Sequence, residues 1–250
     1  MTPGPVISVV LPARNEERLI GAALDSIAGQ TLEPRQVEAI VVSNGSSDRT
    51  AAIARAEANR LLSGRGLRVK VLTNDSPGIA RAKNAGARAA AGGQLVFMDA
   101  DSRMSSGLLA TIQRRAAGGE RAASIRIVAD GGDPVDRAFF WVLENGKRLL
   151  RIRANMLWME RGLFTQLGGF DESLNHAEDL DLLVRARRQG VPVGHVRDEW
   201  IATSTRRLHR RPLRLGMFAM FARWLLGHVG IGRRWPYQAG GPDSPPLDGP

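Results

Sequence analysis

Four short apolar runs punctuate the first hundred residues, and helical periodicity follows each of the first three. A continuous apolar or β-branched run of this length is typical of a strand that is buried on both faces. Between the runs, apolar residues recur at three- and four-residue spacing, as in Leu19, Ala23 and Ile27, which predicts amphipathic helices. The predicted strands cover residues 6–11, 37–42, 69–72 and 94–98, and the third helix covers 78–91. Strands that alternate with helices predict an α/β fold, with a mostly parallel central sheet flanked by helices.

The pattern becomes less regular after Asp101. We predict helices over 108–115, 134–150 and 161–167, the second broken or bent near Asn145-Gly146, and strands over 122–128 and 155–159. A further helix begins near Glu178, since Leu180, Leu183 and Val184 share one face. No linker interrupts the first two hundred residues, and 43% of the 250 residues are hydrophobic, so we expect one domain over 1–210.

Polar side chains follow all four of the first predicted strands. They are Asn15 and Glu16, Asn44 and Ser46, Asn74 and Asp75, and Asp99 and Asp101. The carboxyl ends of parallel strands line one rim, where open α/β sheets bind their ligands. Backbone amides, helix N-termini and acids at such a rim suit a nucleoside diphosphate with a metal ion. The chain has no GxxxxGK[ST] loop and no GxGxxG after the first strand, which excludes P-loop enzymes and ordinary dinucleotide-binding proteins.

The stretch Gly93–Met104 contains the sharpest of these junctions. The apolar run 95–98 breaks directly into Asp99-Ala100-Asp101. Two carboxylates one residue apart can hold Mg²⁺ or Mn²⁺ through oxygen atoms, with phosphate oxygens completing the coordination. The alternative is that both acids only begin the next turn, and this short motif does not decide between the two interpretations.

A second group of acids lies in Asn175-His176-Ala177-Glu178-Asp179. In one interpretation Asn175 is the N-cap and Glu178 the third helical residue of a capping box, while Asp179 is favoured by the helix dipole. In the other, the first helical turn points Asp179 at a substrate as a general base that the dipole keeps ionised.

The charge of the chain bears on its partners. Thirty-five Lys and Arg against 25 Asp and Glu give a net charge of +10, which favours phosphorylated substrates or an anionic membrane. We predict no nucleic-acid partner, because there is one Tyr and no recognisable nucleic-acid module. The absence of cysteine excludes disulfides and thiolate metal sites. The first residues do not resemble a signal peptide, so we expect a cytoplasmic location, either free or peripheral on the cytoplasmic face of a membrane.

The last forty residues form two further predicted segments. Residues 211–239 are predicted to be an amphipathic helical extension, and 240–250 a disordered Gly/Pro-rich tail. Arg214, Arg223 and His228 interrupt the apolar stretch 213–231, so we do not predict a membrane span, which needs about 20 nearly uncharged residues. An interfacial helix on anionic lipid and a helix packed against the domain or a second copy are the two alternatives.

Taken together, these segments resemble glycosyltransferase family 2, whose members are inverting enzymes with the A-type glycosyltransferase fold. The matching pieces lie between residues 6 and 200 in the family's order. They are VVLPARNEE at 9–17, VVSNGSSDRT at 41–50, GIARAKNAG at 78–86, the Asp-x-Asp motif at 99–101, LGGFDE at 167–172 and Glu178-Asp179. Residues 1–210 would then be the catalytic domain.

The resemblance implies a set of donor contacts. Pro12, Ala13 and Glu16 would contact the nucleoside, Asn44 would lie near the base, and Lys83 near the nucleoside or the diphosphate. The implied donor is a nucleoside-diphosphate sugar. Ser43 stands where the family often has an acid, so the choice between uridine and guanosine stays open.

The resemblance also implies the metal and the base. Asp99 would lie near the ribose and the metal, Asp101 would bind Mn²⁺ or Mg²⁺ directly, and Asp179 would deprotonate the acceptor hydroxyl beside Glu178. A histidine near His209 closes the metal site in some relatives, although the basic run around it has a second interpretation as a solvated surface.

The implied activity is metal-dependent, inverting transfer of one sugar to an acceptor hydroxyl, on an acceptor that could be lipid-linked. No Gln-x-x-Arg-Trp motif is present, which favours a single addition over polymer synthesis. Trp158 either stacks on the acceptor or packs in the core. A sugar-phosphate nucleotidyltransferase and a non-catalytic basic scaffold are the alternative functions, and the oligomeric state is not indicated.

Overall fold

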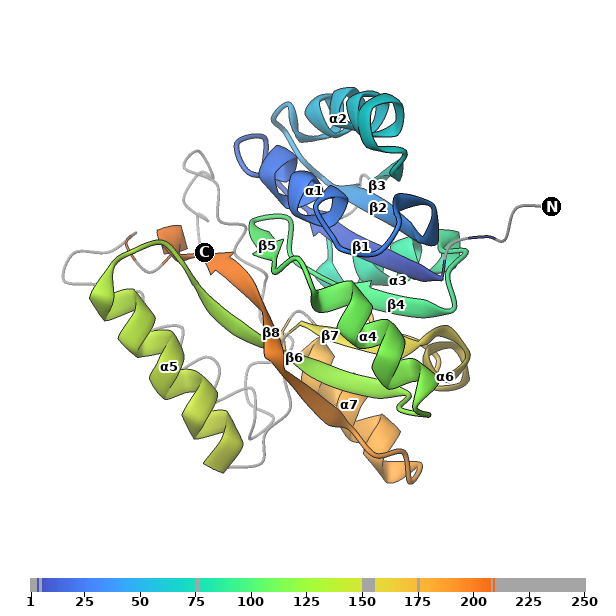
Figure 1. Ribbon diagram of the computed structural model, residues 1–250, viewed down its shortest axis with the longest axis vertical. Helices are drawn as coiled ribbons and strands as arrows, with labels where there is room; N and C mark the ends of the chain where they lie inside the picture. Colours follow the sequence, from blue (N-terminus) through green and yellow to red (C-terminus); the bar gives the residue numbers. More distant parts are fainter. Residues whose placement is uncertain are drawn as a thin grey trace, which may run out of the picture.

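The computed structural model describes residues 4, 6–74, 77–149, 156–174, 176–207 and 209. They contain an eight-stranded sheet with the strand order β3-β2-β1-β4-β7-β6-β8-β5 (Figure 1). The strands are β1 Ile7–Ala13, β2 Val37–Asn44, β3 Arg68–Asn74, β4 Gln94–Phe97, β5 Ser102–Met104, β6 Ala122–Asp130, β7 Leu157–Glu160 and β8 Gly194–Ser204.

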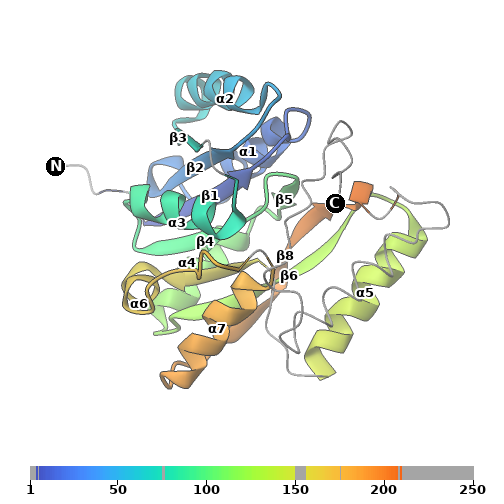
Figure 2. The ribbon, with the colours of Figure 1, turned by 180° about the vertical axis from the view of Figure 1, so that it is seen from behind.

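Helices cover both faces of this sheet. They are α1 Ile20–Ala28, α2 Thr50–Arg65, α3 Ile79–Ala89, α4 Leu108–Ala117, α5 Pro134–Leu149, α6 Arg161–Gln166 and α7 Glu178–Arg188, with 3₁₀ turns at Pro34–Gln36 and Thr205–Arg207. Two apolar clusters fill the layers: Leu24 of α1, Leu61 of α2 and Leu109 of α4 belong to one. Phe164 of α6 and Leu183 of α7 belong to the other, with residues of α3 (Figures 1 and 2).

The first half of the sheet is parallel, as the sequence predicts. β1 pairs in parallel with both β2 and β4, and β2 pairs in parallel with β3. Every residue of β2 is buried, whereas the edge strand β3 alternates between more and less exposed positions. The carboxyl ends of these four strands therefore share one edge, and the predicted α/β fold is confirmed.

The second half of the sheet is mixed, and the sequence predicts it less well. β7 runs antiparallel to β4 and β6, while β8 runs parallel to β6 and antiparallel to β5. The sequence pattern does not predict β5 or β8. β5 has only three residues. In β8 the register with β6 is irregular between Ile125 and Arg126, which leaves 197–199 unpaired with β6. The predicted break near Asn145-Gly146 is wrong, because α5 continues through both residues.

Close packing of α3 on the sheet positions the residues that matter for the site. A Cβ atom on Gly86 would lie 2.3 Å from Val10 Cγ1, so only glycine permits this approach. α3 also carries Lys83 and Asn84, both buried. The glycine therefore fixes how far these two polar side chains reach beyond the sheet.

The described part of the chain contains no helix that is long and apolar enough to cross a membrane. The predicted amphipathic segment 211–239 and the tail 240–250 lie outside the described residues, as does Asn175. The alternatives stated for the amphipathic segment therefore stay predictions.

Candidate active site

The loops after β1 and β2 are joined by hydrogen bonds into one wall of the rim. The Glu16 amide donates to Thr50 Oγ1 at 2.8 Å, and the Glu17 amide donates to Asp48 Oδ2 at 3.1 Å. Asn15 adopts a positive φ of 55°, and its side-chain oxygen accepts from the Ser47 amide at 2.9 Å. Asn residues tolerate this backbone conformation better than most, so the sequence suits the turn.

Three of the predicted nucleoside contacts lie on this wall. Pro12 pairs with Val42 and Ala13 with Ser43 in the register of β1 and β2, and Glu16 is buried in the loop that follows. Asn44 ends β2 and is 4% exposed, yet its Oδ1 atom has no hydrogen-bond partner within the part of the chain that the structure describes. A buried acceptor of this kind is costly unless a ligand satisfies it, and an N–H group of a base would do so.

An arginine links the predicted metal ligand Asp101 to this wall. Asp101 is buried, and its backbone oxygen accepts from the Ser204 amide at 3.2 Å. The guanidinium of Arg206 forms an ion pair with Glu16 and lies 3.7 Å from Asp101 Oδ2. This part of the rim therefore already holds one positive charge between two acids.

The predicted set of Asp99, Asp101 and His209 is not gathered in this conformation. No group of three or more His, Cys, Asp or Glu among the described residues is placed to hold a metal ion. His209 Nε2 lies 2.7 Å from Asp136 Oδ2 of α5 instead. Two aspartates with the oxygens of a bound diphosphate are still the hard oxygen donors that Mg²⁺ and Mn²⁺ take.

The most distinctive feature of the site is a buried lysine with two carboxylates. Lys83 Nζ donates to Glu178 Oε1 at 2.8 Å and to Asp179 Oδ1 at 2.7 Å. The Lys83 and Asp179 side chains are 4% and 15% exposed, and the ammonium also lies 5.1 Å from the centre of the Phe170 ring. The resemblance implied a donor contact for Lys83, whereas the structure places it against the two acids of α7.

Burial and charge set the protonation of this cluster. Burial raises the pKa of Asp179 to about 7, with Lys83 opposing the shift and Glu178 adding to it. Burial alone lowers the pKa of Lys83, but the carboxylates of Asp179, Glu178 and Asp99 outweigh it and raise that pKa above its usual value. Burial therefore acts against the helix dipole, which we expect to keep Asp179 ionised, and favours the protonated carboxyl group.

The start of α7 excludes one of the two interpretations of Glu178. The N-cap is Ala177, in a left-handed conformation with φ 59°, and Glu178 is the first helical residue. The capping-box interpretation, which needs Glu178 at the third helical position, is therefore wrong. Glu178 is buried against Lys83 instead.

Asn84 fixes the turn that leads into α7, and sequence reasoning missed it. Its Nδ2 donates to the Phe170 oxygen at 2.9 Å and to Glu172 Oε1 at 3.0 Å, and its Oδ1 accepts from the Phe170 amide at 2.9 Å. Its position next to Lys83 in GIARAKNAG was the available signal. Trp158, by contrast, is fully buried and packs in the core, so the stacking interpretation is not supported.

Comparison with known sequences identifies the relatives of the chain. A family model described as Glycosyl transferase family 2 matches residues 8–165. Validoxylamine A glucosyltransferase of Streptomyces hygroscopicus subsp. limoneus is 25% identical over 236 residues, which cover 78% of this chain and 51% of that protein. A PGL/p-HBAD biosynthesis glycosyltransferase of Mycobacterium bovis (strain BCG / Pasteur 1173P2) is 30% identical over 193 residues, covering 72% and 69%. The uncharacterized glycosyltransferase EpsJ of Bacillus subtilis (strain 168) is 32% identical over 112 residues, covering 45% and 30%. The chain thus spans about half of the first of these relatives and about a third of the last.

Solved structures with the same fold are found as well. S. aureus TarS 1–349 in complex with UDP superposes with a TM-score of 0.65 at 20% identity, covering 91% of this chain and 72% of that one. Mannosyltransferase PcManGT from Pyrobaculum calidifontis, in complex with GDP-Man and Mn²⁺, gives 0.65 at 24% identity, covering 89% and 65%. The sheet and its rim therefore define an A-type glycosyltransferase fold, as predicted. The chain belongs to glycosyl transferase family 2, since the family model spans more than half of it.

Proposed function

We propose that this chain transfers one sugar from a nucleoside-diphosphate sugar to an acceptor hydroxyl, with inversion at the anomeric carbon. The buried Lys83–Glu178–Asp179 cluster carries the proposal, because it places a carboxyl group with a pKa of about 7 beside the nucleotide rim. A general base is most effective when its pKa lies near the working pH. The relatives' names and the nucleotides bound to the two superposed structures support a nucleotide-sugar donor.

In this proposal Lys83 holds Asp179 through Oδ1, and the second carboxylate oxygen receives the proton of the acceptor hydroxyl. The acceptor oxygen forms a bond to the anomeric carbon while the bond from that carbon to the diphosphate breaks. Attack from the side opposite the leaving group inverts the centre, through an oxocarbenium-like transition state as in glycoside hydrolysis. Glu178 and Lys83 keep the base in one orientation, so they are positioning residues.

The donor side of the proposal uses the two loops of the rim. Asn44 Oδ1 would accept from the base. Asp99 and Asp101 would hold Mn²⁺ or Mg²⁺, with oxygens of the diphosphate as further donors. A divalent ion bound there would neutralise negative charge on the leaving diphosphate. An ion held by Asp101 would compete with Arg206, whose guanidinium lies 3.7 Å from the same carboxylate.

A thermal-shift panel tests the donor site first. UDP-, GDP- and TDP-sugars are each added with and without Mn²⁺, because a ligand that binds only the folded state must raise the Tm. We expect one nucleotide class to give a Mn²⁺-dependent rise that Asp101→Asn abolishes. A panel without any rise, from well-folded protein, would contradict the proposal.

Asp179→Asn separates binding from chemistry. We expect this variant to keep the Tm rise with the same donor and to lose transfer by about 10²–10⁴-fold, the usual contribution of a general base. Transfer at the wild-type rate would remove Asp179 from this role. Asp181→Asn is the matched control, because Asp181 lies on the same helix and bonds Arg185 instead of Lys83.

A further inference from the structure

The helix α5 stands apart from the other helices, alongside the extended part of β6 (Figures 1 and 2). Its residues Phe140 and Leu143 are buried in the apolar cluster that includes Ile127 of β6. Further along the helix, Glu144 Oε2 lies 3.5 Å from His195 Nε2 of β8. These contacts occupy one face of α5 and leave its other faces to a partner or to solvent.

A row of apolar and small residues runs along a second face of α5. Its members recur at spacings of four, three and four residues, which places them in one line along the helix: Val135, Phe139, Val142 and Gly146. Val135 and Val142 are 49% and 57% exposed, and Phe139 is only partly buried. A Cβ atom on Gly146 would meet no described atom within 4 Å. Helices pack against other helices through rows of this kind, and exposed apolar surface of this extent marks an interaction site.

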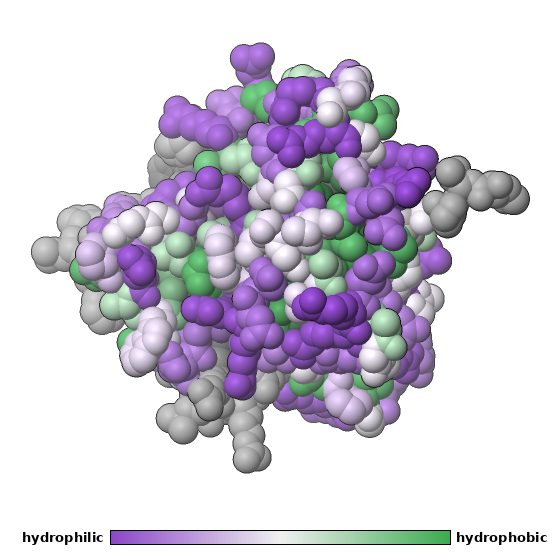
Figure 3. Space-filling view, viewed as in Figure 1, coloured by the Kyte–Doolittle hydropathy of each residue, from purple (hydrophilic) through white to green (hydrophobic). Residues whose placement is uncertain are grey.

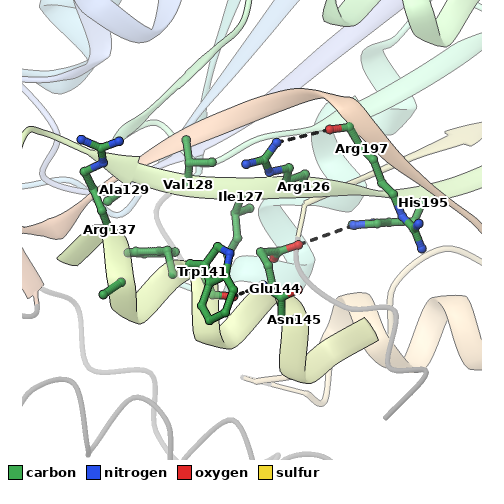
Figure 4. Close-up of a pocket in the computed structure, with 12 residues that line it drawn as sticks. Arg126, Ile127, Val128, Ala129, Arg137, Trp141, Glu144, Asn145, His195 and Arg197 are labelled. Carbon is green, nitrogen blue, oxygen red and sulfur yellow. Dashed lines mark hydrogen bonds and ion pairs between the residues drawn. The ribbon is translucent and has the colours of Figure 1, made fainter. Parts of the chain in front are cut away.

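The side of α5 that faces β6 is different in character. Figure 4 shows an open hollow there, with a volume of about 680 Å³, lined by Trp141 together with charged residues such as Arg137 and Glu144. Figure 3 shows hydrophobic and hydrophilic residues mixed over the region of α5. Val135 and Val142 are not among the residues that line the hollow. The apolar row is therefore a separate face of the helix.

The chain itself supplies a segment that begins beside this row. His209 is the last residue that the structure describes, and its Nε2 lies 2.7 Å from Oδ2 of Asp136, in the first turn of α5 and next to Val135. Three residues separate His209 from the apolar stretch 213–231. A linker this short keeps the stretch near α5 at an effective concentration on the order of millimolar, far above that of a second copy in dilute solution.

The stretch 213–231 carries a matching row. Pro212 suits the first position of a helix. A helix from there brings four apolar residues into one line, again at spacings of four, three and four: Phe218, Ala222, Leu225 and Val229. Met220 and Arg223 would lie on the opposite side. Each row is about 17 Å long at 1.5 Å per residue, so the two can pack along their whole length.

We propose that the apolar row of α5 is the docking site of residues 213–231 of the same chain, which pack on it as a helix through the row from Phe218 to Val229. Docking would remove Val135 and Val142 from water and hold the preceding turn, with Arg206, against Glu16 of the rim. The proposal does not depend on the transfer reaction proposed above. An anionic membrane and a second copy of the chain are the competing occupants, and the experiment distinguishes them.

Thiol labelling of the full chain tests the proposal, because the chain has no cysteine and an introduced thiol is the only one present. Val142→Cys places the thiol in the row. Leu62→Cys is the matched control, since Leu62 of α2 is 54% exposed and Val142 is 57% exposed. Each rate with a small maleimide, without lipid, is divided by the rate of the same variant in urea. We expect the thiol at 142 to react at least about tenfold more slowly than the thiol at 62, because a docked segment must open before the reagent can reach it.

A second substitution in the segment makes the test specific. Leu225→Asp puts a charge into the row of the segment, and Met220→Asp puts the same charge on its opposite side. We expect Leu225→Asp to bring the labelling of Val142→Cys to within about twofold of the Leu62→Cys rate, because a buried charge opposes docking. Met220→Asp should leave the protection in place.

Each other outcome overturns the assignment. Equal labelling of the thiols at 142 and 62 would mean that nothing covers the row. Protection that appears only with anionic vesicles would assign the row to a membrane, and protection that is lost on dilution would assign it to a second copy. Protection that survives Leu225→Asp, or that both aspartate variants abolish equally, would exclude docking through the row of the segment.

Discussion

Replacing Lys83 by Met should both destabilise the protein and abolish transfer. Met fills a similar volume but removes the ammonium that bonds Glu178 and Asp179, leaving two buried carboxyl groups without their cation. Breaking a buried ion pair by removing one partner costs about 3–5 kcal/mol, a large share of the roughly 5–15 kcal/mol by which domains are stable. We expect the free energy of unfolding to fall by about that amount at pH 8.

The loss of stability in the Lys83→Met variant should be larger at high pH than at low pH. Burial raises the folded-state pKa of Asp179 to about 7, above its unfolded value near 4. The contribution of Asp179 to the free energy of unfolding is therefore fully present below pH 4, and it is lost as the pH rises through 7. Without Lys83 the pKa rises further, because the attraction that opposes the shift is gone. The destabilisation of the Lys83→Met variant should therefore be smaller at pH 5 than at pH 8.

Urea denaturation at both pH values measures this effect. The matched control is Lys70→Met, because Lys70 also bonds a buried acid, Glu38, but is 44% exposed and Glu38 keeps its bond from Ser8. We expect the control to cost about 0–1 kcal/mol. Adding Glu178→Gln and Asp179→Asn to Lys83→Met should restore most of the stability. A Lys83→Met loss no larger than that of the control, or no restoration, would refute the account of this cluster.

The remaining predictions concern the base, its support and the packing of α3. With the pKa of Asp179 raised to about 7 by burial, transfer should fall about tenfold per unit as the pH drops well below 7, and a flat profile from pH 5 to 8 would exclude this base. Asn84→Ala should lower the free energy of unfolding by about 2–4 kcal/mol, because it leaves the buried backbone groups of Phe170 without partners. Urea titration measures this loss, and a loss below about 1 kcal/mol would contradict the role given to these hydrogen bonds. Gly86→Ala should cost about 1–3 kcal/mol by forcing a methyl group into Val10, whereas Gly64→Ala, with no atom nearby in α2, should stabilise by up to about 1 kcal/mol. Thermal unfolding of the two glycine variants in parallel would contradict the packing argument if their melting temperatures move in the same direction.

The sequence determined the parallel half of the fold and the rim that it presents. The strand 37–44 is buried on both faces, so its central residues 39–42 form a continuous apolar run and polar residues mark its end. Asn44, Asp99 and Asp101 could be located in this way because each lies at the end of a strand or within four residues of it. The same local signal fails for β8, where 197–199 interrupt the pairing and the charged residues give no strand periodicity.

Only the tertiary structure decided the surroundings of Asp179, the proposed base. Lys83 and Asp179 are 96 positions apart, and nothing in either segment reports that α3 and the start of α7 meet. Gly86 sets the depth of α3 and Asn84 holds the turn before α7, so the ion pair depends on two packing relationships at once. The protonation of Asp179 follows from that burial, because the free energy of a charge depends on the water removed from around it, which local sequence does not specify.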